Sequence, residues 1–223
     1  MRGSTSTPGR ATSTPGMRRR TPRSERDVSC TASGLGRRVP GRPCVGVAML
    51  RLTGGSARGR TLPGRVQRGV RPTSSRVREA LFSMVGQDLS GSRVLDACAG
   101  SGLLGLEAWS RGAEVVAVER NRRAAAVARD NARAVGADVG GWSLTVGDVT
   151  RMVEELGPFD GVVADPPYVE DPDRWLARLA PVAARWLVLE VDARRVAPAE
   201  TDSGGRLTVR RFGSTALWVV RSA

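Results

Sequence analysis

The spacing of apolar residues divides the chain into an irregular front and a regular body. Residues 1–48 are rich in Ser, Thr, Pro, Gly and Arg and hold few large apolar side chains. They show neither the two-residue period of a strand nor the 3.6-residue period of a helix. Such a segment cannot bury enough apolar surface to offset the entropy that is lost on ordering. We therefore predict that residues 1–48 form a disordered extension.

The regular body begins with short β runs around glycine turns. Residues 49–53 and 60–62 each have the composition of a short strand, which predicts a small β-hairpin. Apolar residues then recur at helical spacing over 75–85, and Thr73 or Ser74 can cap this helix.

Strands and helices alternate along the rest of the chain. The predicted strands are 93–97, 114–119, 142–146, 160–164 and 186–190. The helices expected between them are 103–110, 122–135, 150–156 and 173–179. An antiparallel hairpin is predicted at the end by two further β runs, 206–211 and 215–220. This order is typical of an α/β fold, a Rossmann-like and mostly parallel seven-stranded sheet with helices on both faces. We expect three parts, namely the extension 1–48, a β-hairpin and helix over 49–90, and a main domain over 91–223.

Positive charge is concentrated before residue 79. All 35 basic residues are arginine, 22 residues are acidic, and the formal net charge is +13. Ten arginines lie in residues 1–48 and eight in residues 49–78, which contain no acid, whereas residues 79–223 hold 17 arginines and 20 acids. A basic segment beside a net-acidic domain indicates a polyanionic partner such as RNA. A GC-rich codon bias would also produce an arginine-only composition.

Three interpretations of residues 1–48 stay open. The segment is a basic arm that binds RNA, an organellar transit peptide, or sequence translated upstream of a true start at Met49. We favour the third.

The composition excludes several kinds of chemistry. The chain has no histidine, so Ser-His pairs, Cys-His pairs and His-ligated metals are excluded. Cys30, Cys44 and Cys98 are too few and too unevenly spaced for a disulfide framework or a zinc site. No apolar run reaches the roughly 18 residues that a membrane span needs. We therefore expect neither a metal nor a membrane partner.

A glycine-rich turn leads from the first strand of the main domain into its first helix. Gly100, Gly102 and Gly105 let the backbone turn sharply and approach a ligand closely. Glu119 closes the next strand, 23 residues after Asp96, and this spacing suits a carboxylate that accepts from two ribose hydroxyls. Asp96, at the end of the strand, would face a cationic ligand rather than a pyrophosphate.

Alternatives to this interpretation stay open, and for the loop one of them is an ordinary tight turn between a strand and a helix. Its glycine spacing also satisfies the dinucleotide fingerprint, so a nicotinamide oxidoreductase is a weaker candidate. Asp148 either bonds the amino group of an adenine or caps the helix that follows it, and the sequence favours neither.

A second motif, Asp165-Pro166-Pro167-Tyr168, ends the fourth predicted strand. The two prolines fix the backbone, so the Asp165 carboxylate and the Pro166 carbonyl can act as fixed acceptors. Together they can accept from both N–H groups of an exocyclic amine, which returns electron density to a poorly nucleophilic nitrogen. Tyr168 offers a ring on which a base can stack. The structural alternative is a rigid Pro-Pro loop with a capping aspartate.

These residues resemble the class I S-adenosylmethionine-dependent methyltransferases, and the second motif resembles the subgroup that methylates amino groups of nucleobases. Residues 71–82, Arg-Pro-Thr-Ser-Ser-Arg-Val-Arg-Glu-Ala-Leu-Phe, follow Gly54, Gly55 and Gly59 and resemble the opening of the bacterial RsmD family. That family methylates the exocyclic N2 of a guanine in 16S ribosomal RNA. The resemblance covers residues 49–223. The aromatic residue that the family carries before the glycine loop is here Cys98.

The resemblance implies a site for S-adenosylmethionine and a site for a flipped guanine. We expect the cofactor to contact Asp96, Ala97, Gly100, Ser101, Gly102, Glu119, Arg120, Asp148 and Val149. The guanine would be held by the catalytic residues Asp165, Pro166, Pro167 and Tyr168.

From the charge pattern alone we expect RNA phosphate contacts at five arginines, Arg58, Arg60, Arg71, Arg76 and Arg78. The alternatives are a solvated basic face and, for Arg76, an ion pair with Glu79.

The sequence thus predicts a monomeric cytoplasmic enzyme that methylates guanine N2 of 16S rRNA within the assembled small ribosomal subunit. One alternative is a DNA or protein amino-methyltransferase of the same fold. The other is an RNA-binding assembly factor without catalytic activity.

Overall fold

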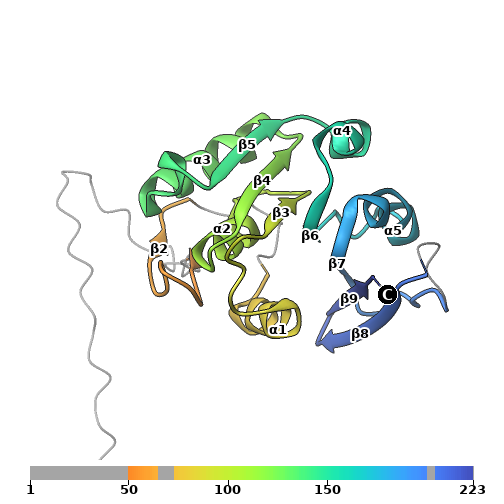
Figure 1. Cartoon of the computed structure of the whole chain (residues 1–223). Helices are drawn as coiled ribbons and strands as arrows, with labels where there is room; N and C mark the ends of the chain where they lie inside the picture. The colour runs from red at the N-terminus through yellow and green to blue at the C-terminus, as the bar shows by residue number, and fades with distance from the viewer. Residues whose placement is uncertain (1–49, 65–72, 200–203, 223) are drawn as a thin grey trace, which may run out of the picture. The chain divides into compact units, whose positions relative to one another are not determined.

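The computed structural model describes residues 50–64, 73–199 and 204–222. The predicted disorder of residues 1–48 and the predicted RNA contact of Arg71 lie outside the described residues. The described strands are β1 (Leu50–Arg51), β2 (Thr61–Leu62), β3 (Arg93–Asp96), β4 (Glu114–Glu119), β5 (Trp142–Val146), β6 (Phe159–Ala164), β7 (Ala183–Asp192), β8 (Arg206–Phe212) and β9 (Thr215–Arg221). The described α-helices are α1 (Ser75–Val85), α2 (Leu103–Ser110), α3 (Arg122–Val135), α4 (Val149–Leu156) and α5 (Pro172–Leu179) (Figure 1).

A seven-stranded sheet in the order β5-β4-β3-β6-β7-β9-β8 forms the centre of the described fold. The five strands from β5 to β7 are parallel to their neighbours, and β9 pairs antiparallel with both β7 and β8. The predicted sheet and its closing hairpin are confirmed. From β3 the following strands β4 and β5 are added on one side, and from β6 the strand β7 is added on the other side. The carboxyl ends of β3 and β6 therefore flank the crevice in which doubly wound sheets bind ligands.

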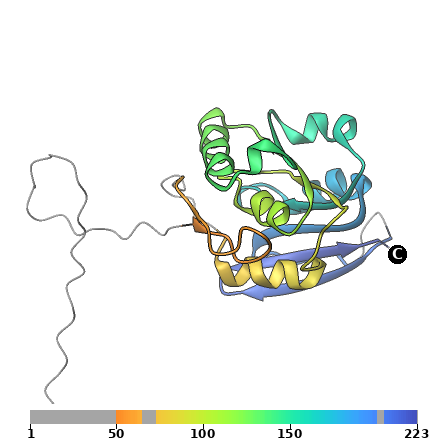
Figure 2. The same ribbon diagram turned by 60° about the vertical axis from the view of Figure 1, so that its left-hand side comes forward.

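Helices cover both faces of this sheet because successive strand residues point to opposite sides. On β3, Val94 packs in the core that contains residues of α1, α2 and α3, whereas Leu95 packs with residues of α4 and α5. On β9, Leu217 and Trp218 divide in the same way. Figure 2 shows α1 running along the C-terminal hairpin of β8 and β9.

Most predicted boundaries agree with the structure because local capping residues set them. Ser74 accepts a hydrogen bond from the Val77 N–H and begins α1, so Ser74 and not Thr73 is the cap. Asn121 caps α3, which ends at Gly136 in the left-handed conformation. Helix α4 begins at Val149, one residue earlier than predicted.

The largest difference is the length of β7. The sequence predicts residues 186–190, and the strand spans Ala183–Asp192. β7 pairs with β9 from Trp186 to Asp192 and with β6 from Ala183 to Leu189, so partners on both sides extend it past its apolar centre. β8 lies at the edge of the sheet and pairs with β9 alone, and its exposed residues are Arg206, Arg210 and Arg211.

A buried carboxylate holds the N-terminal hairpin and α1 against α2. Glu107 is fully buried, and its Oε1 accepts from the Thr53 N–H at 2.8 Å and from Arg78 Nε at 3.0 Å. Its Oε2 accepts from the Thr53 hydroxyl at 3.2 Å and pairs with Arg111. The guanidinium of Arg111 also lies 4.1 Å from the centre of the Phe82 ring. Three elements therefore converge on one side chain.

The prediction that Arg78 contacts RNA is wrong. Arg78 is 4% exposed, and besides Glu107 it donates to the Thr73 carbonyl at 2.6 Å and to the Arg51 carbonyl at 2.7 Å. Its guanidinium is therefore used inside the protein and is closed to a phosphate. Charge counting along the sequence could not separate this arginine from its exposed neighbours.

Replacing Glu107 with alanine leaves two buried guanidinium groups without their carboxylate. We expect the free energy of unfolding to fall by about 3–5 kcal/mol, the size seen when one member of a buried ion pair is removed. The measurement is urea denaturation followed by circular dichroism.

Glu154→Ala is the matched control for that substitution. Glu154 pairs with Arg178 on the surface, its side chain is 72% exposed, and its loss is expected to cost under about 0.5 kcal/mol. Equal costs for the two variants would contradict a structural role for Glu107.

Candidate active site

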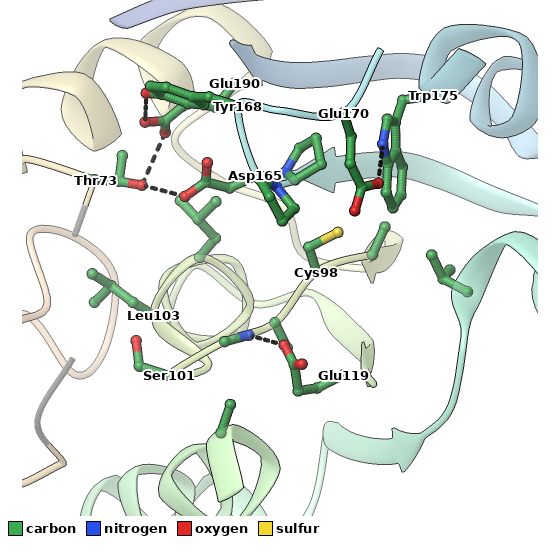
Figure 3. A pocket seen from close by; sticks show the side chains of 18 of the residues that line it. Thr73, Cys98, Ser101, Leu103, Glu119, Asp165, Tyr168, Glu170, Trp175 and Glu190 are labelled. Carbon is green, nitrogen blue, oxygen red and sulfur yellow. Dashed lines mark hydrogen bonds between the residues drawn. The ribbon is translucent and has the colours of Figure 1, made fainter. Parts of the chain in front are cut away.

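A cavity of about 1090 Å³ opens at the carboxyl ends of the parallel strands. The glycine loop after β3 and the end of β4 line one part of it, and the Asp165–Tyr168 turn after β6 lines another. Figure 3 shows Glu119 and Ser101 at one end, Asp165, Glu190, Tyr168 and Thr73 at the other, and Cys98 between them. The two predicted motifs therefore face one space.

Glu119 fixes the glycine loop while lining the cavity. Its Oε2 accepts from the Gly100 N–H at 2.8 Å, and its Oε1 accepts from the Asn121 N–H at 2.7 Å. Gly100 has a φ of +54°, and a Cβ atom added there would have no neighbour closer than 3.9 Å. The loop therefore presents open backbone to the cavity, and a ligand can approach it closely.

Asp96 does not have its predicted position toward a cofactor. It is fully buried, lies outside the cavity lining, and accepts the Gly105 N–H at 2.8 Å through Oδ2. Burial raises the pKa of its carboxyl to about 7. A Cβ atom on Gly105 would lie 2.8 Å from this oxygen, so glycine is required for the contact. Asp96 therefore stabilises the first turn of α2 through this hydrogen bond.

Gly102 also differs from its predicted role in cofactor binding. It lies outside the cavity lining and begins α2 with a φ of +78°, where a Cβ atom would come within 3.2 Å of Ala128 on α3. Gly102 therefore allows two helices to pack closely. The other expected cofactor residues do line the cavity, namely Ala97, Gly100, Ser101, Glu119, Arg120, Asp148 and Val149.

Asp148 both caps a helix and faces the cavity. Its Oδ1 accepts from the Thr150 N–H at 3.0 Å and from the Thr150 hydroxyl at 2.8 Å, which begins α4. The hydrogen bond from the Thr150 hydroxyl is the main cause that lowers the pKa of Asp148. The residue also lines the cavity, so the cap does not exclude ligand contact.

The other end of the cavity brings together residues from four separate segments. Thr73 Oγ1 donates to Glu190 Oε2 at 2.9 Å and lies 3.4 Å from Asp165 Oδ2, so one hydroxyl lies between two carboxyl groups (Figure 3). The Tyr168 hydroxyl donates to Glu190 Oε1 at 3.3 Å and lies 2.9 Å from Thr215 Oγ1. The sequence predicts Asp165 and Tyr168 here. It considers Thr73 only as a helix cap, and it gives no role to Glu190 or Thr215.

These groups titrate abnormally because they are buried. Burial, and then the nearby charge of Glu190, holds the pKa of Asp165 well above its usual range. Burial also raises the pKa of Glu190, and it raises that of Tyr168 to about 12. Two buried acids that lie close together do not ionise independently. The carboxyl groups of Asp165 and Glu190 therefore stay protonated to a higher pH than a surface carboxyl does.

Cys98 lies between the two ends of the cavity. Burial is the main cause that raises the pKa of its thiol, and the nearby carboxylates add to the effect. The thiol is therefore protonated at neutral pH and fills space as a small apolar group.

Glu170 lines the cavity and accepts two side-chain hydrogen bonds. Its Oε2 accepts from Trp175 Nε1 at 3.0 Å, and its Oε1 accepts from Arg120 Nη2 at 3.0 Å. Arg120 follows β4 and Glu170 follows the Asp165–Tyr168 turn, so this contact connects the two motifs. Sequence reasoning missed Glu170 and Trp175, because no local pattern distinguishes them from other helix-start residues.

The structure describes four of the five arginines that are expected to contact RNA, and their surroundings differ. Arg60 donates to the carbonyls of Ala134 and Val135 at 2.6 and 2.8 Å and thereby caps α3. Arg58 and Arg76 are exposed, and the described residues include no ion pair between Arg76 and Glu79. None of the described four lines the cavity.

Within the described part of the chain, no group of three or more His, Cys, Asp or Glu residues could hold a metal ion. None of the described helices is long and apolar enough to cross a membrane.

Comparison with known proteins identifies a family and several relatives. The family described as "Conserved hypothetical protein 95" matches residues 50–221. YlbH of Bacillus subtilis (strain 168) is 35% identical over 127 residues, which are 54% of this chain and 68% of that protein. Ribosomal RNA small subunit methyltransferase D of Escherichia coli (strain K12) is 34% identical over 132 residues, 55% of this chain and 62% of that protein. The match thus spans slightly less than two thirds of the E. coli relative.

The fold agrees with solved structures of this kind. The hypothetical protein TTHA0928 of Thermus thermophilus has 30% sequence identity and a TM-score of 0.65, covering 77% of this chain and 98% of that one. SAM-dependent methyltransferases also share the fold at lower identity, so the predicted Rossmann-like class I methyltransferase fold is confirmed. The chain therefore belongs to the family described as Conserved hypothetical protein 95, which is the RsmD family of class I methyltransferases.

Proposed function

We propose that the protein transfers a methyl group from S-adenosylmethionine to the exocyclic N2 of a guanine in 16S ribosomal RNA. One observation carries the proposal: a single cavity joins the glycine loop and Glu119 to the Asp165–Tyr168 turn. Its volume of about 1090 Å³ slightly exceeds the roughly 300–1,000 Å³ of pockets for one small ligand. A cofactor and an extruded base both fit such a space.

The residues at the glycine-loop end suit the cofactor. Glu119 and Asp148 offer carboxylate oxygens to the hydroxyl and amino donors of a nucleoside, and Gly100 leaves room beside the loop. The cofactor supplies an electrophilic methyl group when it is bound. A chain without histidine is consistent with this chemistry, because an amine that attacks a sulfonium methyl needs alignment more than a strong base.

The residues at the other end suit an exocyclic amine. In the proposed reaction, the Asp165 carboxylate and the Pro166 carbonyl accept from the two N2–H groups and hold the nitrogen lone pair toward the methyl group. The N–C bond would form as the bond between the methyl group and the cofactor's sulfur breaks, and the sulfur would keep the electron pair of that bond. The proton that the amine loses would pass to the buried acid pair of Asp165 and Glu190 before release to solvent. Tyr168 provides a ring beside the base.

The names of relatives support the RNA substrate. E. coli and Haemophilus influenzae proteins called ribosomal RNA small subunit methyltransferase D match at 34% and 35% identity. We propose that residues 49–90 position the RNA through exposed arginines such as Arg58 and Arg76. We also propose that the substrate is the assembled small subunit and that the protein acts as a cytoplasmic monomer.

The direct test incubates the protein with labelled S-adenosylmethionine and small subunits that lack the modification. We expect label in N2-methylguanosine after nuclease digestion and mass spectrometry. Normal cofactor binding without label in RNA would overturn the proposed substrate.

Asp165→Asn tests the role of the carboxylate in that assay. We expect the rate to fall by about 10²–10³-fold, the usual cost of removing one group that stabilises the transition state. Cofactor affinity, measured by calorimetry, should change little, because Asp165 lies at the opposite end of the cavity from Glu119. A loss of cofactor affinity as large as the loss of rate would contradict the assignment.

Glu119→Ala tests the other end. This substitution removes the acceptor for the Gly100 N–H and the expected ribose contact, so we expect cofactor affinity to fall by about tenfold or more. Glu114→Ala is the matched control, because Glu114 is an exposed residue at the opposite end of the same strand. Equal affinities in the two variants would refute this role.

The dependence of the rate on pH follows from the buried acids. Burial raises the pKa of Asp165 and of Glu190, and the proposed mechanism needs the ionised pair. The rate should therefore rise with pH through values well above the ordinary carboxyl pKa of about 4. The measurement is kcat/KM across the range in which the protein stays folded. A rate already constant from about pH 5 upward would contradict this assignment.

A further inference from the structure

We propose that Glu190 selects guanine over other bases by accepting the N1–H of the base that Asp165 holds at N2. The inference rests on the proposed function, and it assigns to Glu190 a task that the methyl-transfer chemistry does not require. It depends on the position of the side chain, on the hydrogen bonds that the side chain already makes, and on the shape of the donor edge of guanine.

Glu190 is placed where a second acceptor would be needed. It lies in β7, which pairs with β6 in parallel, and Asp165 directly follows β6. The residue is 5% exposed, and it lines the cavity together with Asp165. The hydroxyl of Thr73 lies between the two carboxyl groups, 2.9 Å from one and 3.4 Å from the other. Figure 3 shows all three side chains converging on the same point.

The hydroxyl donors around this pair leave acceptor capacity unused. Thr73 has one hydroxyl proton, and the shorter distance assigns it to Glu190 rather than to Asp165. Tyr168 has one hydroxyl proton, which it can give to Glu190 while it accepts from Thr215. A carboxylate has about four acceptor positions, so Glu190 keeps about two and Asp165 keeps more. Buried acceptors without donors are costly, and a ligand with several N–H groups on one edge relieves that cost.

Guanine is the base whose edge supplies those groups. Its N2 amine and its N1–H stand side by side, so two adjacent carboxyl groups can both accept from it. Adenine and cytosine have an amine next to a ring nitrogen that carries a lone pair, and that lone pair would face the Glu190 oxygens. A buried carboxylate paired with a lone pair loses its hydrogen bond and gains repulsion, which is the stronger kind of discrimination. Burial raises the pKa of both acids and so favours their protonated forms. N–H donors that enter the site act in the opposite direction, because they stabilise the ionised carboxylates.

Thr73 is a positioning residue in this arrangement. Its carbonyl accepts from Arg78, which pairs with Glu107, and its hydroxyl donates to Glu190. The orientation of the Glu190 carboxylate is thus set from two sides, by Thr73 and by Tyr168.

The experiment compares two bases that share the reacting 2-amino group and differ on the neighbouring edge, where guanine has N1–H and a 6-oxo group and 2,6-diaminopurine has an N1 lone pair and a 6-amino group. The target guanine is first mapped with the unaltered protein. Small subunits are then reconstituted with 16S rRNA in which 2,6-diaminopurine replaces that guanine, because this base keeps the 2-amino group and has a lone pair at N1. We expect the unaltered protein to methylate guanine about 10- to 100-fold faster than 2,6-diaminopurine, as expected when one buried hydrogen bond is lost.

Glu190→Gln should lower the rate on guanine and narrow the ratio between the two bases, because an amide can also donate to a ring nitrogen. Asp192→Asn is the matched control: the same chemical change, two residues along the same strand, at a carboxylate that bonds Arg194 outside the cavity. It should leave the ratio unchanged. Cofactor affinity and the thermal midpoint of Glu190→Gln show whether the variant is folded.

The two proposals fail in different ways. If no RNA is methylated although the cofactor binds, the proposed function is wrong. If guanine is methylated and 2,6-diaminopurine reacts equally fast, or if Glu190→Gln keeps the full ratio while folded, the role of Glu190 is wrong and the function stands.

Discussion

The buried pairing of Glu107 with Arg78 and Arg111 is the interaction on which the geometry of the site depends. Glu107 belongs to the first helix of the main domain, and through it the N-terminal hairpin and α1 are held to that helix. Arg78 also donates to the Thr73 carbonyl, and it thereby fixes the position of Thr73. The hydroxyl of the same residue lies between Asp165 and Glu190. A structural ion pair and the chemical end of the cavity are therefore connected by a short chain of contacts.

Among the described residues, neither Asp165 nor Glu190 forms an ion pair with an arginine, and the two carboxyl groups lie on either side of the Thr73 hydroxyl. β6 and β7 are adjacent parallel strands, so Asp165 and Glu190 line one end of the cavity, whereas Glu119, at the end of β4, lines the other. The arginines near them are engaged elsewhere: Arg78 with Glu107, and Arg120 with Glu170. Burial raises the pKa of Asp165 and of Glu190, and the N–H donors of the proposed guanine would offset their negative charge.

Local sequence was sufficient for most of the fold, and for part of the site. A capping residue such as Ser74, together with clear apolar periods, allowed most helix and strand boundaries to be predicted to within a residue or so, with β7 as the main exception. The two motifs lie in one crevice because they follow β3 and β6, which are neighbouring parallel strands. Contacts between distant segments could not be predicted: Thr73 and Glu190 are 117 positions apart. The burial of Asp96 was missed for a related reason, because a carboxylate at a strand end can point toward solvent, ligand or core, and packing against Gly105 decides which.

The arginines of β8 have a consequence that concerns neither catalysis nor RNA. Among the described strands β8 is an outermost one, and an outer edge is where the strand of another sheet could pair. Arg206, Arg210 and Arg211 are exposed along this edge. Bringing two such strands together would place like charges in contact, and large guanidinium groups would have to be displaced. The same residue type that marks the basic front of the chain thus protects the far end of its sheet from aggregation.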